Sequence, residues 1–152
     1  MQRVLFIASS GGHYKQLRKL DPLIGKYHGI VITERIRTLE KEKGVRYLHQ
    51  VNRKEKLFPF WLFVNAVHSF LIFLAVRPDV IVTTGVLCAI PMCLIAKMFK
   101  RHVIYIESFA KVITPTETGK FIYRHHLADA FFVQWKSMLD VYPDAVYAGS
   151  LY

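Results

Sequence analysis

Two loops of the sequence combine small residues with side chains that could bind an anion or move a proton. The first, at residues 9–13, reads SSGGH; it follows an apolar run and precedes a helical pattern. Backbone N–H groups of Ser10, Gly11 and Gly12 could approach an anion, and a helix start adds partial positive charge. His13 could act beside them as a charge partner or as a base. A tight strand-to-helix turn requires the same small residues, so both interpretations stay open.

The second loop, Thr84-Gly85, follows an apolar run at 79–83, and a carboxylate, Glu107, follows a further run at 102–106. A carboxylate at the mouth of a strand could deprotonate a sugar hydroxyl or orient it through hydrogen bonds. Apolar neighbours would make Glu107 a better base near neutral pH. The alternative is that Glu107 caps the segment that follows it.

A nicotinamide dinucleotide site is a weaker interpretation of the first loop. Such a site has the pattern GxGxxG, with an acidic residue about twenty positions later. Glu34 stands near that position, but the glycine spacing of the loop does not fit the pattern.

The elements that must position these residues follow from hydrophobic periodicity. Short β-branched runs alternate with helical stretches, which is typical of a parallel sheet with crossover helices. Strands are predicted near 3–8, 29–33, 45–50, 79–83, 102–106, 129–133 and 145–147, and helices near 13–24, 34–43, 58–76, 86–99, 116–126 and 135–141. We therefore predict one Rossmann-like α/β domain, 1–152, with helices on both faces of the sheet. Because parallel strands end at one edge, the loops after residues 8, 83 and 106 should line one cleft.

The charge and cysteine content of the chain limit the kinds of molecule that it is expected to bind. Lys and Arg outnumber Asp and Glu by 21 to 11, and the net charge of +10 predicts attraction to phospholipid head groups, a pyrophosphate or nucleic acid. The basic residues are scattered without interleaved stacking aromatics, which disfavours nucleic acid. Cys88 and Cys93 have neither metal-ligand nor disulfide spacing and are expected in the core. No metal or cofactor is predicted, and a strand-like run from Val4 predicts a protein without a secretory signal that faces the cytosol.

The segment 57–76 is apolar and as long as a transmembrane helix. Its polar members, Asn65, His68 and Ser69, would form one narrow stripe. A single crossing is disfavoured, because the strands predicted on either side must join one sheet. We expect instead a helix in the membrane interface, and the alternative is a helix buried in the core or against a partner. The expected membrane-binding residues and basic flanks are Phe58, Trp61, Phe63, Phe70, Arg53, Lys54, Lys56 and Arg77.

Several of these residues belong to a longer pattern that resembles one protein family over essentially the whole chain. The pattern comprises SSGGH at 9–13, RPD at 77–79, TG at 84–85, ESFAKV at 107–112 and PTxTGK at 115–120, followed by Asp129, Gln134-Trp135 and Tyr142-Pro143. It resembles the membrane-anchor subunit of the dolichyl-diphosphate GlcNAc transferase and its bacterial capsule and exopolysaccharide counterparts. The ESF and PTxTGK blocks are specific, whereas SSGGH is shared with the lipid-II-forming GlcNAc transferase.

The resemblance implies the N-terminal, acceptor-side half of an inverting GT-B glycosyltransferase. A separate small polypeptide would supply the donor half and hold most of the UDP-sugar, since one sheet domain of this length has no room for a second. The acceptor would be a lipid-diphosphate-linked sugar at the cytoplasmic face of the cell membrane. Eukaryotic members carry an N-terminal transmembrane anchor that we expect this chain to lack, so the helix at 57–76 would attach it.

The resemblance and the loop positions together give the candidate site. The candidate catalytic residues are Glu107 and His13, and the candidate acceptor- and phosphate-binding residues are Ser10, Gly11, Gly12, Thr84 and Gly85. The alternative function is a non-catalytic membrane anchor that activates its catalytic partner.

Overall fold

The computed structural model describes residues 2–35, 42–51 and 55–152. Seven parallel strands form one sheet in the order β3-β2-β1-β4-β5-β6-β7. The strands are β1 Val4–Ala8, β2 Ile30–Arg35, β3 Val45–His49, β4 Val80–Thr83, β5 His102–Ile106, β6 Ala130–Val133 and β7 Val146–Tyr147. The seven predicted strands are confirmed, and their ends agree with the prediction to within two residues. The predicted Rossmann-like fold is also confirmed. The order reverses between β1 and β4, which is where such sheets bind ligands.

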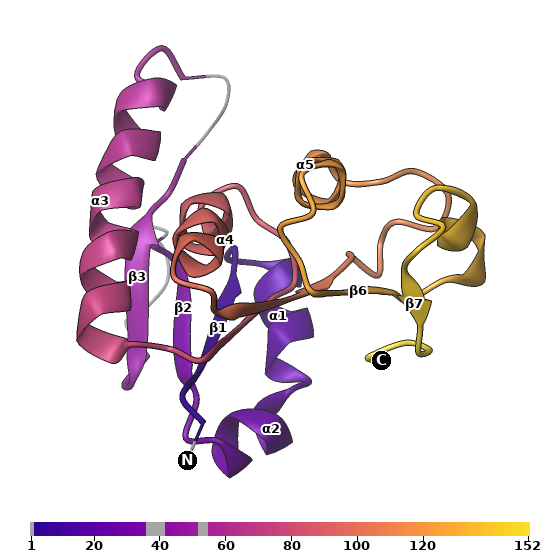
Figure 1. Ribbon diagram of the computed structural model, residues 1–152, viewed down its shortest axis with the longest axis horizontal. Coiled ribbons are helices and arrows are strands. Elements are labelled where there is room, and N and C mark those ends of the chain that lie inside the picture. Colours follow the sequence, from indigo (N-terminus) through magenta and orange to yellow (C-terminus); the bar gives the residue numbers. More distant parts are fainter. Residues whose placement is uncertain (1, 36–41, 52–54) are drawn as a thin grey trace.

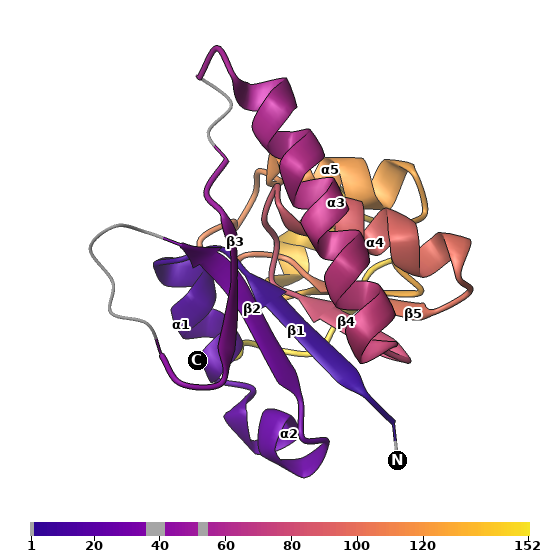
Figure 2. The ribbon, with the colours of Figure 1, turned by 90° about the vertical axis from the view of Figure 1, so that its left-hand side faces the viewer.

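Helices cover both faces of the sheet (Figures 1 and 2). The helices α3 Phe58–Val76, α4 Ala89–Met98 and α5 Glu117–Arg124 lie on one face. The shorter helices α1 Gly12–Arg18 and α2 Asp21–Lys26 lie on the other, near β1 and β2. A 3-10 helix, η1 Lys136–Asp140, follows β6 where a helix at 135–141 was predicted.

The core consists of one layer of side chains on each face of the sheet. Leu5 and Ile7 of β1 pack among residues of α3, α4 and α5, whereas Phe6 and Ala8 pack with Leu17 of α1. Successive side chains of a strand point to opposite faces, so β1 serves both layers and all five of its residues are buried. Burial on both faces explains why the central strands are uninterrupted apolar runs.

The continuous helix predicted at 13–24 is wrong, because α1 ends at Arg18 and α2 begins at Asp21. Pro22 lies in the first turn of α2. Its nitrogen has no hydrogen to donate, and its ring clashes in a continuous helix with the carbonyl four residues earlier, which belongs to Arg18. Proline is tolerated in a first turn, so the chain starts a new helix there.

The helix predicted at 34–43 is wrong at both of its described ends. Glu34 and Arg35 extend β2 and pair with Leu48 and His49 of β3, so the parallel ladder continues past the predicted boundary. Residues 43–44 form a turn that leads into β3, and 36–41 lie outside the described residues. The helices predicted at 86–99 and 116–126 exist but are shorter than expected.

The helix α3 is tied to β3 by the side chain of Asn65. Asn65, fully buried, accepts a hydrogen bond from the backbone N–H of His49 (3.0 Å) and donates one to its carbonyl (2.7 Å). Ser69 is also buried, whereas His68 is exposed. Two of the three polar residues predicted to form a stripe, Asn65 and Ser69, therefore face the protein interior.

The opposite side of α3 is apolar and exposed to solvent. Phe63 is 67% exposed and Leu71 is 58% exposed, and Phe60 is more than half exposed as well. In the described chain, α3 is the one helix that is long and apolar enough to cross a membrane. The strands that flank it, β3 and β4, lie in the same sheet, which argues against a crossing.

Candidate functional site

The structure brings the first two predicted loops together at the carboxyl edge of the sheet. Thr84, at the end of β4, donates from Oγ1 to the backbone carbonyl of His13 (3.1 Å). The imidazole Nδ1 of His13 lies 2.9 Å from the carbonyl oxygen of Thr84. A carbonyl oxygen only accepts, so Nδ1 carries the proton of this bond and Nε2 is the nitrogen that can change its state. The paired bonds fix the imidazole at the switch point between β1 and β4.

The glycines of the first loop leave open space beside His13. Gly11 has φ +86°, a conformation that other residues adopt only with strain. A Cβ atom at Gly11 or Gly12 would have no other atom within 4 Å, and both residues are exposed. Ser10 is half-buried at the same turn. The backbone of this loop is therefore accessible to a ligand.

Gly85 serves a packing function that its predicted role in anion binding did not include. It is buried, has φ +87°, and donates its N–H to Oγ1 of Thr83 (3.3 Å). A Cβ atom there would lie 2.8 Å from the hydroxyl of Tyr105. Glycine thus allows the β4 loop to lie directly against β5.

Glu107 lies at the end of β5, but its carboxylate points into the protein and is 1% exposed. Oε1 accepts hydrogen bonds from the N–H of Ser108 (2.8 Å) and Oγ1 of Thr116 (2.9 Å). Oε2 accepts from the hydroxyl of Tyr142 (2.8 Å) and the N–H of Thr116 (3.2 Å). Neutral donors from three segments thus compensate for the lost hydration of the carboxylate.

Two tyrosines keep their protons beside this carboxylate. Burial, followed by the negative charge of Glu107, raises the pKa of Tyr142 above its ordinary value, and the same causes raise the pKa of Tyr105. Both phenols therefore stay neutral donors throughout the physiological range. The Tyr105 hydroxyl also lies 3.1 Å from Oγ1 of Thr116.

The backbone of Glu107 ties two further elements to the same point. Its carbonyl accepts from the side-chain amide of Gln134, after β6 (2.9 Å), and from that of Gln16 in α1 (3.4 Å). Gln16 in turn accepts from the N–H of Phe109 (3.2 Å), and both glutamines are buried. These bonds connect the β5 loop to α1, the helix that contains His13.

Sequence reasoning missed most of this network. Gln16 and Tyr105 were not singled out for any role, and Thr116, Gly119 and Tyr142 entered only through the family pattern. Thr116 could have been recognised as a helix cap, since its side chain accepts from the N–H of Gly119 at the start of α5 (2.9 Å). The roles of Gln16 and Tyr142 have no local signal in the sequence.

Glu34 and the two cysteines, Cys88 and Cys93, are also buried. Burial raises the pKa of the Glu34 carboxyl, and a hydrogen bond with Cys88 partly offsets that effect. Burial also raises the pKa of both Cys88 and Cys93, so each is a neutral thiol in the core, as predicted. Among the described residues, no group of three or more His, Cys, Asp or Glu side chains is arranged to hold a metal ion.

The expected membrane-binding residues differ in exposure. Lys56, Phe63 and Phe70 are exposed, whereas Phe58 and Trp61 are half-buried. The Trp61 ring stacks on His49 with their centroids 3.8 Å apart, so it belongs to the contact between α3 and β3. Arg53 and Lys54 lie outside the described residues.

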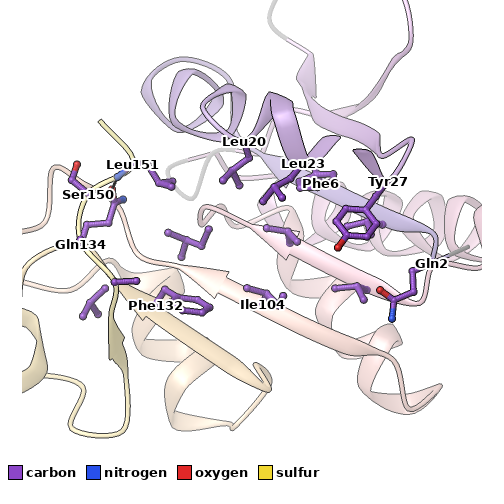
Figure 3. A pocket seen from close by; sticks show the side chains of 17 residues that line it. Gln2, Phe6, Leu20, Leu23, Tyr27, Ile104, Phe132, Gln134, Ser150 and Leu151 are labelled. Atoms are coloured by element: carbon purple, nitrogen blue, oxygen red, sulfur yellow. Dashed lines mark hydrogen bonds between the residues drawn. The ribbon is translucent and has the colours of Figure 1, made fainter. Parts of the chain in front are cut away.

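An apolar hollow of about 440 Å³ lies on the face of the sheet that carries α1 and α2 (Figure 3). Ile104 and Phe132 form its floor, and Leu20, Leu23 and Tyr27 form one wall. Residues 148–151 close the opposite side. The two short helices thus leave part of this face, over β4, β5 and β6, without a helical cover.

The same fold occurs in solved structures of nucleotide-sugar enzymes. The S. aureus MnaA–UDP structure superposes with a TM-score of 0.70 at 12% identity, covering 99% of this chain and 46% of that one. The Acinetobacter baumannii MurG structure superposes with a TM-score of 0.67 at 15% identity, covering 88% and 41%. The chain therefore has the Rossmann-like α/β fold of GT-B enzymes, and it spans less than half the length of these two proteins.

The chain belongs to the family described as "Oligosaccharide biosynthesis protein Alg14 like", whose model matches residues 34–151. It is 28% identical over 181 residues to the UDP-N-acetylglucosamine transferase subunit ALG14 of Mus musculus, covering 98% of this chain and 82% of that protein. The Homo sapiens protein of the same name is 27% identical over 179 residues, with 97% and 82% covered. The family resemblance inferred from the sequence is confirmed.

The Glu107 network predicts that Gly119 cannot be replaced without loss of stability. A Cβ atom at Gly119 would lie 2.2 Å from Oε2 of Glu107 and 2.7 Å from the Tyr142 hydroxyl. We expect Gly119→Ala to lower the free energy of unfolding by about 1–3 kcal/mol, as overpacking of a dense core does. Chemical denaturation followed by circular dichroism would measure the change.

Gly25→Ala is the matched control. Gly25 also lies in a helix, but a Cβ atom there meets no other atom within 4 Å. This variant should be unchanged or more stable by up to about 1 kcal/mol, because alanine favours helix. Equal stability of the Gly119→Ala and Gly25→Ala proteins would contradict the packing described for Glu107.

Proposed function

We propose that this chain is the acceptor-side subunit of a two-component, UDP-sugar-dependent glycosyltransferase acting on a lipid-diphosphate-linked sugar. The relatives named as subunits of a UDP-N-acetylglucosamine transferase support this assignment. The observation that carries it is the pairing of His13 with Thr84 beside the open glycine loop, at the switch point of the sheet. The enzyme would be inverting and would build a capsule or exopolysaccharide repeat unit.

His13 is the residue in this arrangement that can take part in the reaction. Its Nδ1 is engaged with Thr84, which leaves Nε2 to face a ligand. A neutral Nε2 accepts the proton of the attacking sugar hydroxyl, and a protonated one pairs with the diphosphate of the acceptor. The accessible backbone at Ser10, Gly11 and Gly12 would hold the same diphosphate.

Glu107 acts differently from a general base in this proposal. Its carboxylate is buried and saturated by internal donors, so a sugar hydroxyl has no path to it without displacement of Thr116 or Tyr142. Its effect on the reaction is to position α1 through Gln16, and with α1 the imidazole of His13. This burial also favours the second candidate function, a non-catalytic anchor and activator of the partner, which places the reacting groups on that partner.

The donor-binding partner has an apolar surface available for pairing. The hollow over β4, β5 and β6 is lined almost entirely by apolar side chains, and the short helices α1 and α2 leave it uncovered. Apolar surface of this kind is typical of a protein interface. We assign it to the partner subunit, which would hold most of the UDP-sugar.

The opposite face of the molecule attaches to the membrane in this proposal. Its exposed apolar residues on α3 point away from the sheet, while the buried Asn65 and Ser69 point toward it. Exposed Lys56 and Arg77 stand near the two ends of the helix, where cations meet anionic head groups. The chain would lie on the cytoplasmic face of the cell membrane without crossing it.

Substitutions of His13 test the role of Nε2 in the reaction. With the purified partner present, we expect His13→Ala to lower kcat/KM by about a hundred- to ten-thousand-fold, the usual loss of a positioned general base. His13→Asn should be equally impaired, because its amide can replace Nδ1 as donor to Thr84 but has nothing in place of Nε2. Steady-state transfer from a radiolabelled UDP-sugar would measure both, with co-purification as the check that pairing persists.

The asparagine variant separates the two candidate functions. Activity restored by His13→Asn but not by His13→Ala would mean that His13 only holds the β4 loop. Near-wild-type rates in both variants would move the chemistry to the partner and leave this chain as its anchor.

Membrane attachment is tested at residues that project from α3 into solvent. We expect Phe60→Ser with Leu71→Ser to release the chain from anionic phospholipid vesicles without unfolding it, because both side chains are more than half exposed. Vesicle co-sedimentation would measure the loss. The matched control replaces Leu23 and Val146, comparably exposed apolar residues outside α3, by serine. Equal release of both double variants, or of neither, would argue against attachment through α3.

A further inference from the structure

A second apolar depression lies between α3 and α4, on the face opposite the hollow. Its volume is about 650 Å³, and all twelve residues that line it are apolar, seven from α3 and five from 87–95. The helices α3 and α4 are in contact and lie side by side on this face of the sheet (Figure 2). Phe63, Phe70 and Leu94 stand exposed at its rim. We define this depression as the α3–α4 groove.

The groove runs lengthwise along both helices. The lining residues of α3 extend from Phe58 to Phe70, which corresponds to about 18 Å at 1.5 Å per residue. Those of α4 recur at helical spacing from Ile90 to Ile95. A long and wholly apolar groove fits an extended hydrocarbon chain better than a sugar or a nucleotide, since its lining side chains offer no polar partner.

One end of the groove meets the candidate site. Helices that connect parallel strands run against the strand direction, so α3 and α4 both begin at the carboxyl edge of the sheet. Leu87, which lines the groove, follows Gly85 by two residues, and the adjacent Thr84 is bonded to His13. The apolar groove is thus continuous along the chain with the β4 loop, whose Thr84 is bonded to His13 beside the glycine loop.

We propose that the α3–α4 groove binds the hydrocarbon chain of the lipid-diphosphate acceptor. The inference rests on the proposed function, which supplies the acceptor, and it adds where the lipid lies. The first units of the chain would enter beside Leu87 with the diphosphate at the glycine loop, and the remainder would pass between Phe63 and Phe70 into the bilayer. The groove would then orient the acceptor toward His13 as well as hold the protein at the membrane.

Binding of soluble probes to the purified chain tests this assignment without any transfer reaction. Farnesyl diphosphate should bind at least about tenfold more tightly than inorganic diphosphate, because each buried methylene adds roughly fourfold in affinity. Ala66→Phe places a ring in the groove and should abolish that preference while diphosphate binding persists. Ile90→Phe, on the other wall, is a second filling variant with the same expected result. Isothermal titration calorimetry would measure each affinity.

Ala75→Phe is the matched control, since Ala75 is exposed on α3 outside the groove. It should retain the preference for farnesyl diphosphate, and all three variants should still bind vesicles because each adds apolar surface. Equal binding of the two probes by the wild-type chain, or no binding of farnesyl diphosphate, would overturn the proposal. So would an unchanged preference in a folded Ala66→Phe or Ile90→Phe protein. Displacement of the probe by dihexanoyl phosphatidylglycerol would assign the groove to bulk phospholipid instead.

The outcome is independent of the transfer reaction. A groove that selects the farnesyl chain in a protein whose complex transfers no sugar would leave this inference standing while the proposed function failed. Sugar transfer that is insensitive to acceptor chain length and to Ala66→Phe would have the opposite meaning and would overturn the inference alone.

Discussion

The arrangement of the carboxyl edge depends on a single buried anion. The Glu107 carboxylate lies beneath the first turn of α5 and accepts hydrogen bonds from Ser108, from the backbone and side chain of Thr116, and from the hydroxyls of Tyr105 and Tyr142. Two of these donors are backbone N–H groups, one bonded to each carboxylate oxygen, and a backbone N–H can only donate. A buried carboxylate without such donors would be strongly destabilising. The segments after β5, before α5 and after η1 must therefore converge at this point for the chain to fold.

The buried Glu107 also determines the position of His13, the residue that could take part in the reaction. The carbonyl of Glu107 and the N–H of Phe109 hold Gln16, three positions after His13 in the chain. The Tyr105 hydroxyl leaves room only for glycine at position 85, which fixes the loop that carries Thr84. Thr84 and His13 then close the connection through their two hydrogen bonds. The buried anion and the accessible imidazole are thus two ends of one hydrogen-bonded framework, and substitution at either would be felt at the other.

The sequence alone was sufficient for the sheet and for the grouping of the loops. Parallel strands buried on both faces are continuous apolar runs, and Gly11, Thr84 and Glu107 follow three of them, so their common edge could be predicted. The surroundings of Glu107 could not be predicted, because Tyr142 lies 35 residues away in the chain and its approach depends on tertiary packing. The break at Pro22 was readable, but helical periodicity on both sides of it outweighed the proline. An apolar, outward-facing side of α3 was predicted from the sequence. The hydrogen bonds of Asn65 to β3 became apparent only in the structure.

The division of labour between two subunits is the central claim, and equilibrium binding to this chain by itself tests it most directly. Isothermal titration of the purified chain should show binding of a lipid-diphosphate-linked sugar, presented in nanodiscs, and far weaker binding of UDP-N-acetylglucosamine. Addition of the partner should then confer affinity for the nucleotide sugar. Tight binding of UDP-N-acetylglucosamine to the isolated chain, together with no affinity for the lipid-linked sugar, would contradict the account and make this chain the donor half.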